Sequence, residues 1–118
     1  MRNKFLAGLN TLVTFSIIVG IYRCVPSSSS TQARLQACQN HVEITRKLSG
    51  KPNIRYSWHD TSWKGVVGIV LHGFGQIDTA NNQATYGIGV YLSLEYYSHV
   101  SAGYSDVDED GLRHMVLC

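Results

Sequence analysis

The sequence predicts a single α+β domain, and three observations lead to that fold class. A chain of 118 residues has room for one domain, with a hydrophobic core that can form without help from other domains. Hydrophobic residues make up 44% and charged residues 15%, which is the composition of a globular protein. Short runs with strand-like alternation are mixed with two helix-like stretches, and this mixture is typical of an α+β domain.

The first stretch, Phe5 to Tyr22, is almost uncharged and has more than one interpretation. The favoured one is a short apolar turn over Phe5 to Leu9 followed by a buried strand over Thr11 to Ile21, which is rich in β-branched residues. Arg2 and Lys4 also give the basic start of a secretory signal, but no small-residue cleavage site follows. A membrane-anchored or secreted fragment therefore stays an alternative, and it requires Phe5 to Tyr22 to form one helix.

Two helices follow, each with recognisable ends. After the serine-rich connector Val25 to Thr31, the pattern predicts a helix over Ala33 to Lys47 with Thr31 as its cap. The second helix is predicted over Ser62 to Leu71, where closely spaced apolar residues supply one face. Gly73 is expected to end it as a left-handed cap.

Three further strands are predicted, over Ile54 to Trp58, Val90 to Leu94 and Leu112 to Cys118. The acidic run before the last strand is expected to form a hairpin turn at Asp110–Gly111. Because the sequence ends within an apolar strand, we expect the domain to be truncated. An open apolar edge of this kind favours aggregation or a partner.

Several chemistries are disfavoured by what the sequence lacks. The net charge of +2 is spread without a basic block, so no direct nucleic-acid contact is predicted. The calcium-loop-like segment from Asp106 has Leu117 where a bidentate glutamate is needed, and the histidines lack metal-ligand spacing. Gly87–Ile88–Gly89 is not followed by the third glycine of a dinucleotide fingerprint. Three widely spaced cysteines predict reduced, partly buried thiols of an intracellular protein, namely Cys24, Cys38 and Cys118.

A set of segments, taken in order, resembles the catalytic domain of the poly(ADP-ribose) polymerase (PARP) superfamily. These are Tyr56 to Ser62, Ile69 to Gly75, Tyr86 to Leu92 and Ser101 to Tyr104. Further segments resemble the plant similar-to-RCD-one (SRO) family: Phe5 to Leu9, Ile21 to Arg23, Gln32 to Gln36, Val42 to Lys47, Asn53 to Trp58, Ser105 to Gly111 and His114 to Cys118. The resemblance implies a partial ADP-ribosyltransferase fold over residues 4–118, with a split, mainly antiparallel sheet and two helices.

The same resemblance implies where a nicotinamide adenine dinucleotide (NAD) site would lie. His59 matches the histidine that holds a ribose, and Tyr91 matches the tyrosine of the Gly-x-Gly-x-Tyr segment. Ser101 and Tyr104 match the amide-binding serine and the second ring-stacking tyrosine. Asp60 stands where the family has a glycine, so NAD binding is expected to be weak or absent.

The resemblance also implies that the domain is inactive. The family's catalytic glutamate lies on a later strand that has no counterpart among these 118 residues, and that carboxylate stabilises the charge that develops as nicotinamide leaves. The acids near the matched tyrosines fall in predicted turns or strand ends: Glu95, Asp106, Asp108, Glu109 and Asp110. The family implies a nuclear stress or developmental regulator that acts through protein partners such as transcription factors, without membrane attachment. The alternative is an active mono-ADP-ribosyltransferase whose acid comes from elsewhere.

Overall fold

The structure is a computed structural model that describes residues 1–14, 17–75 and 89–118. The chain divides into two compact units. One combines Met1–Ile21 with Tyr56–Cys118, and the other is the segment Tyr22–Arg55.

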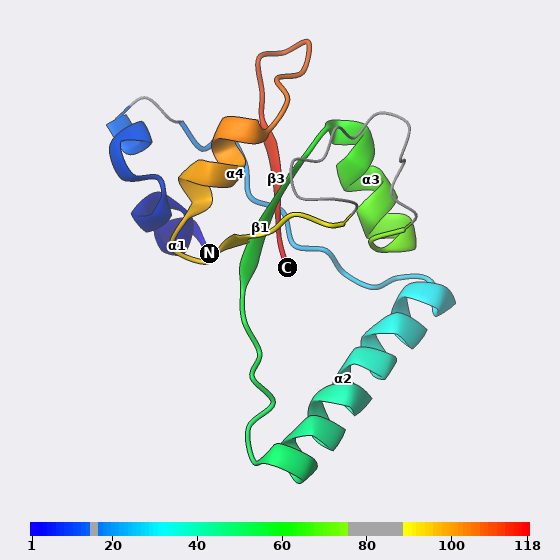
Figure 1. Ribbon diagram of the computed structural model, residues 1–118. Helices are drawn as coiled ribbons and strands as arrows, with labels where there is room; N and C mark the ends of the chain where they lie inside the picture. The colour runs from blue at the N-terminus through cyan, green and yellow to red at the C-terminus, as the bar shows by residue number, and fades with distance from the viewer. Residues whose placement is uncertain (15–16, 76–88) are drawn as a thin grey trace. The chain divides into compact units, whose positions relative to one another are not determined.

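The first unit is built on a three-stranded antiparallel sheet in the order β2-β1-β3. The central strand β1 is Ser57–Thr61, and its neighbours are β2, Ser93–Leu94, and β3, His114–Leu117. Trp58 lies opposite Ser93 on one side and opposite Leu117 on the other. Figure 1 shows β1 running beside β3 through the middle of this unit.

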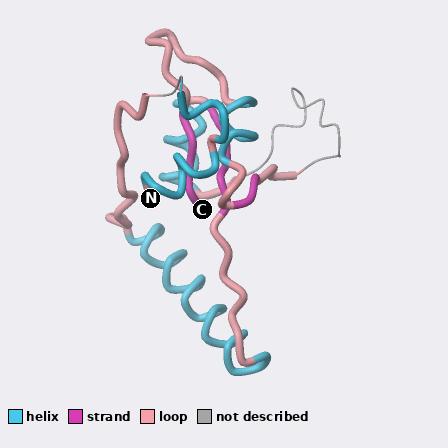
Figure 2. Tube along the Cα trace, turned by 90° about the vertical axis from the view of Figure 1, so that its left-hand side faces the viewer, coloured by secondary structure: helices cyan, strands magenta, loops and turns pink. Residues whose placement is uncertain are grey.

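Three α-helices and a short 3-10 helix accompany the sheet, and Figure 2 shows them beside the strands. They are α1 (Arg2–Gly8), η1 (Asn10–Thr14), α3 (Trp63–His72) and α4 (Ser98–Tyr104). Helix α3 contacts β1 and β3, whereas α4 contacts β1, β2 and α1. The sheet is therefore held by helices that come from both ends of the sequence.

The core of this unit is small and is centred on Trp58, which is 4% exposed. The Phe5 ring packs edge-on against the Trp58 indole, with 5.2 Å between the ring centroids. The indole Nε1 donates a hydrogen bond to the Glu95 carbonyl oxygen at 2.9 Å, which satisfies the polar end of this large apolar side chain. Leu9, on the segment that follows α1, is the other large apolar side chain that is buried among the described residues.

Helix α1 is fixed to α4 through main-chain carbonyl groups. The Ser98 hydroxyl donates to the Phe5 carbonyl oxygen at 2.7 Å, and His99 Nδ1 lies 2.8 Å from the Gly8 carbonyl oxygen. A Cβ atom on Gly8 would lie 2.6 Å from Ser98 Oγ, so glycine permits this close approach. Two segments about 90 residues apart in the sequence thus meet at these contacts.

The second unit contains α2, Ser29–Ser49, an uninterrupted helix with no buried residue. A capping box begins it: the Ser28 hydroxyl accepts from the Thr31 amide, and the Thr31 hydroxyl accepts from the Ser28 amide. Gly50 follows the helix in the left-handed conformation with φ 77°, which an amino acid with a Cβ atom adopts less readily. Local sequence signals thus define both ends of α2.

The hairpin predicted before β3 is present, but its turn runs from Asp108 to Gly111, with Glu109 and Asp110 as the central residues. Gly111 has φ 78°, and Val107 pairs with Arg113 across the turn. The Asp108 carboxylate accepts hydrogen bonds from the Asp110 and Leu112 amides at 2.9 and 2.8 Å, and it lies 2.7 Å from His114 Nε2. The hydrogen bond from His114, followed by that from the Leu112 amide, lowers the pKa of Asp108 below its ordinary value.

The predicted strand over Thr11 to Ile21 is wrong. Residues 10–14 form η1, the described residues 17–21 lie in no strand, and the expected apolar turn before them is helix α1. Ile17 and Val19 remain 88% and 73% exposed, because β-branched residues form a strand only where a neighbouring strand pairs with them. Phe5 to Tyr22 is likewise not one helix, and no helix within the described ranges is long and apolar enough to cross a bilayer.

Other predictions need smaller corrections. Helix α2 includes all of Ala33 to Lys47, and it begins earlier because Ser28, not Thr31, is the capping residue. Helix α3 is confirmed to within one residue, with the Ser62 side chain capping it, although Gly73 combines φ 77° with an extended ψ of −172°. The strand predicted over Ile54 to Trp58 lies at Ser57–Thr61, further along the chain.

The remaining two strands are shorter than predicted. Strand β2 covers the end of Val90 to Leu94, and β3 covers the middle of Leu112 to Cys118. Helix α4 was not predicted. The three cysteines are exposed, so the expectation of partly buried thiols is wrong. The α+β class itself is confirmed.

Candidate nucleotide site

His59, the first matched residue, is held at the centre of the sheet on β1. Its ring Nδ1 lies 3.0 Å from the Tyr91 carbonyl oxygen, and its ring meets the Phe74 ring edge-on at 5.1 Å. One contact comes from the segment before β2 and the other from the residues after α3. These contacts fix the ring orientation, and they join His59 to the main chain of Tyr91.

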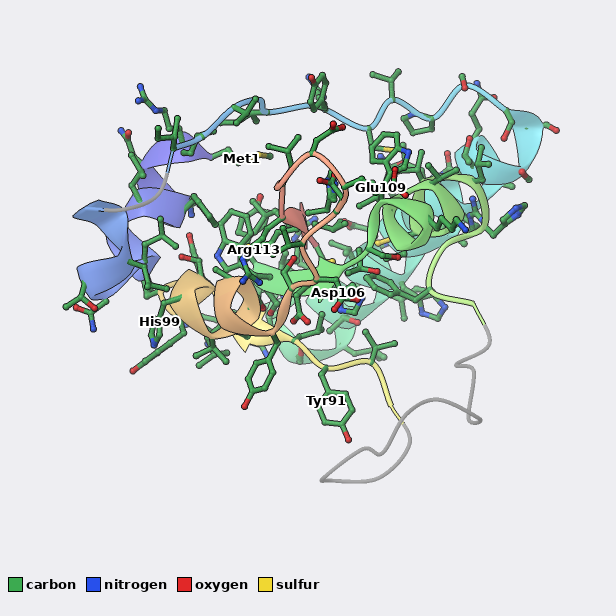
Figure 3. All side chains as sticks on the ribbon, turned by 90° about the horizontal axis from the view of Figure 1, so that it is seen from above. Met1, Tyr91, His99, Asp106, Glu109 and Arg113 are labelled. Carbon is green, nitrogen blue, oxygen red and sulfur yellow. The ribbon has the colours of Figure 1, made fainter. Side chains whose placement is uncertain are left out.

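The Tyr91 side chain takes a different direction from its carbonyl group. It is 42% exposed, and Figure 3 shows its ring extending away from the ribbon beside the segment that precedes β2. The main chain of Tyr91 therefore contacts His59, whereas its ring presents an aromatic face at the surface.

Asp60 follows His59 on β1 and lies opposite Met115 of β3. Successive side chains of a strand point to opposite faces, so the Asp60 carboxylate and the His59 ring leave the strand on different sides. Asp60 is half-buried. It therefore places a negative charge and added bulk where the resembling family has only a hydrogen atom.

Ser101 is built into the core. Its side chain lies on α4 in a residue that is 2% exposed, and its hydroxyl donates to the Trp58 carbonyl oxygen at 3.1 Å. The same Oγ lies 2.7 Å from Ser93 Oγ. Together these bonds connect α4 to β1 and β2, so this hydroxyl has a structural role that needs no ligand.

Tyr104, the last residue of α4, lies three residues after Ser101 but is 79% exposed. Among the four matched residues, the structure joins the His59 side chain to the main chain of Tyr91. It joins Ser101 to Trp58 and Ser93 instead. The position of a nicotinamide site among His59, Tyr91, Ser101 and Tyr104 stays a prediction.

Two residues that shape this region, Phe74 and Ser93, were not predicted as part of the site, and Glu95 was predicted only as a nearby acid. Ser93 lies opposite Trp58 in the sheet register, and register cannot be read from a two-residue strand. Glu95 takes part mainly through its carbonyl oxygen, and every residue has such a group. Its carboxylate pairs with Lys4, whose ammonium group also lies 5.0 Å from the centre of the Tyr56 ring.

An open depression lies along α3 and the residues that follow it. Glycines supply most of its lining: Gly65, Gly68, Ile69, His72, Gly73 and Gly75. None of the five matched residues lines it. Over the described ranges, no group of three or more His, Cys, Asp or Glu side chains has the arrangement of a metal site.

The residues present fit NAD poorly. The nicotinamide amide needs a hydroxyl that can turn toward it, and the Ser101 hydroxyl is enclosed by hydrogen bonds to the core. Asp60 adds a carboxylate next to His59 in the chain but on the opposite face of β1, so the poor fit rests on Ser101. The matched residues follow the order of the family's motif, but the Ser101 hydroxyl is not free to bind a ligand.

The fold identifies the class of protein. No family model matches the sequence. The structure superposes on the crystal structure of the PARP domain of Arabidopsis RADICAL-INDUCED CELL DEATH1 with a TM-score of 0.78 and 33% sequence identity. The match covers 98% of this chain and 62% of that chain. The chain is therefore a PARP-like domain.

Sequence relatives specify the family. The chain is 38% identical over 92 residues to "Probable inactive poly [ADP-ribose] polymerase SRO1" of Arabidopsis thaliana. It is 28% identical over 123 residues to "Probable inactive poly [ADP-ribose] polymerase SRO2" of the same plant. These matches cover 78% and 100% of this chain, but 16% and 38% of the relatives. The PARP-like domain belongs to the plant SRO family.

Proposed function

We propose that this chain is a non-catalytic PARP-like domain that serves as a protein-binding part of a nuclear regulator of stress or development. It transfers no ADP-ribose, and its contribution is made through protein partners such as transcription factors. The relatives SRO1 and SRO2 are named probable inactive polymerases, which supports the same property here.

One observation carries the proposal: the Ser101 hydroxyl is committed to the core. A serine that holds a nicotinamide amide must offer its hydroxyl to the ligand, whereas this one is 2% exposed and bonded to Trp58 and Ser93. Releasing it would break two buried hydrogen bonds, one to the Trp58 carbonyl group and one with Ser93, each contributing about 1 kcal/mol. That cost works against any ligand that needs the hydroxyl.

Asp60 supports the same conclusion electrostatically. As nicotinamide leaves, positive charge develops on the ribose, and a carboxylate helps only if it lies beside that carbon. The Asp60 carboxylate instead leaves β1 on the face opposite His59. On that face it does not lie beside a ribose held by His59, so it does not stabilise the developing charge.

The test is transfer from labelled NAD by the purified chain, with His59→Ala as the matched control. We expect the two proteins to give the same background signal. Modification that exceeds background and disappears in His59→Ala would overturn the proposal in favour of an active mono-ADP-ribosyltransferase. Asp60→Asn and Glu95→Gln would then show which carboxylate supplies the acid.

A further inference from the structure

The two units of the chain differ in charge. The segment Tyr22–Arg55 contains six basic residues and one acidic residue, Glu43, so its net charge is +5. The rest of the sequence contains four basic and seven acidic residues, so its net charge is −3. The value of +2 for the whole chain therefore conceals a basic unit and an acidic unit. The basic residues of the former are Arg23, Arg34, Arg46, Lys47, Lys51 and Arg55.

The basic unit also exposes apolar side chains along α2. One face of the helix carries three apolar residues and a histidine, spaced by four, three and four positions: Ala37, His41, Ile44 and Leu48. Ile44 is 53% exposed and Leu48 is 84% exposed. Lys47 follows Ile44 by three residues and borders this face. Lys51 follows Gly50, which ends the helix. We call Ile44, Lys47 and Leu48, together with Lys51 just beyond the helix, the basic stripe.

Helices in proteins are stabilised mainly by packing of an apolar face, yet no residue of α2 is buried. Its order comes from local interactions, which include the capping box and the Glu43–Arg46 ion pair at 2.6 Å. A helix that holds its shape in this way is a preformed binding surface, so a partner would lose less conformational entropy on docking.

We propose that the basic stripe is a docking surface for an acidic polypeptide segment with interspersed large apolar side chains. Carboxylates of such a segment would approach Lys47 and Lys51, while its apolar side chains would cover Ile44 and Leu48. Charge complementarity with the two lysines requires a negatively charged partner. The exposed Ile44 and Leu48 require that this partner also has apolar side chains. The inference gives a partner chemistry to the protein-binding role proposed above and rests on it.

Other occupants fit this surface less well. A nucleic-acid backbone offers Ile44 and Leu48 no apolar contact, and Glu43 places a carboxylate one helical turn before Lys47. A second copy of α2 would bring two units of net charge +5 together. An acidic segment with apolar side chains satisfies both features of the stripe.

The test is fluorescence anisotropy of the whole chain with a labelled 16-residue peptide in which Glu and Asp alternate with Leu and Phe. We expect Lys47→Glu combined with Lys51→Glu to weaken binding by about tenfold or more, since two attractive pairs become repulsive. Leu48→Ser is expected to weaken binding of this peptide but not of a polyglutamate of the same length. The matched control is Lys64→Glu on α3, which is expected to leave binding unchanged.

Far-UV circular dichroism shows whether each variant keeps its helical content, so that a loss of binding is assigned to the surface. Lys64→Glu changes the net charge by −2, whereas the double reversal changes it by −4. A loss of binding free energy in Lys64→Glu that is half as large as in the double variant would therefore mean that only total charge matters and would overturn the proposal. So would tighter binding to a 16-nucleotide oligothymidylate or to phosphatidylserine vesicles. Self-association of the chain that the double charge reversal abolishes would assign the surface to a second copy instead. Because NAD transfer is measured separately, this proposal and the absence of catalysis can fail independently.

Discussion

The Trp58 cluster and helix α2 represent opposite ways of forming structure. The cluster joins α1, β1, β2 and α4, whose residues are separated by up to about 90 positions, through one buried indole and a few hydrogen bonds. Helix α2 forms from one continuous segment whose ends are set by Ser28 and Gly50. Structure of the first kind depends on the whole unit, whereas structure of the second kind depends on neighbouring residues.

The largest expected effect comes from removing the indole that holds the cluster. Trp58→Ala should lower the free energy of unfolding by about 3–5 kcal/mol, because it removes a buried aromatic side chain and leaves a cavity. Urea denaturation followed by near-UV circular dichroism measures this loss. Trp63→Ala is the control, since Trp63 is 58% exposed and should cost far less. Equal losses would contradict the assignment of Trp58 as the core residue.

A methyl group placed between α1 and α4 tests the contact between the two ends of the sequence. Gly8→Ala should destabilise the chain by about 1–3 kcal/mol, because the new Cβ would lie 2.6 Å from Ser98 Oγ and 2.8 Å from the Ser98 amide. Gly103→Ala in α4 meets nothing within 4 Å and should stabilise by up to about 1 kcal/mol through helix propensity. Thermal unfolding of both variants checks the difference, and destabilisation by Gly103→Ala would argue against the packing described.

The cap of α2 provides the corresponding test in the other unit. Ser28→Ala should cost about 1 kcal/mol of local helix stability, because the Thr31 amide loses its acceptor. Amide hydrogen exchange should rise in the first turn of α2 and stay unchanged in β1. A rise in both regions would show that α2 and the Trp58 cluster are coupled.

The smallest expected effect concerns the hairpin and depends on pH. His114 and the Leu112 amide lower the pKa of Asp108. Its carboxylate therefore stabilises the folded chain at pH values above the ordinary pKa of an aspartate. This contribution is lost as pH falls through the lowered value in the folded state. Acid unfolding of Asp108→Asn should therefore show a weaker pH dependence than that of the unaltered chain, whereas identical profiles would contradict the role of the carboxylate.

The same contrast explains what the sequence could predict. Helices α2 and α3 could be predicted because hydroxyl residues near their starts and glycines after their ends are local signals, although the cap of α2 is Ser28 and not the predicted Thr31. Helices α1 and α4 have no side-chain cap and form where their residues meet each other and β1. The strand expected over Thr11 to Ile21 failed for the converse reason, since β-branched residues need a paired neighbour.

The candidate site was predictable to a similar degree. The order of motifs pointed to His59 and Tyr91, and the structure brings His59 to the Tyr91 main chain. The order of motifs could not reveal that the Ser101 hydroxyl bonds to Trp58 and Ser93, because that contact depends on how α4 packs on the sheet. A residue matched by sequence to a ligand-binding role can therefore have a structural role that only three-dimensional contacts define.

The most direct test of the account is Ser101→Ala, with unfolding free energy and NAD binding measured on the same protein. The account predicts a loss of about 1–3 kcal/mol in stability, because the Trp58 carbonyl group and the Ser93 hydroxyl lose a buried partner. It also predicts that titration calorimetry gives the same weak or absent NAD signal before and after the change. Unchanged stability together with loss of a measurable NAD affinity would contradict the account, because Ser101 would then serve the ligand and not the fold.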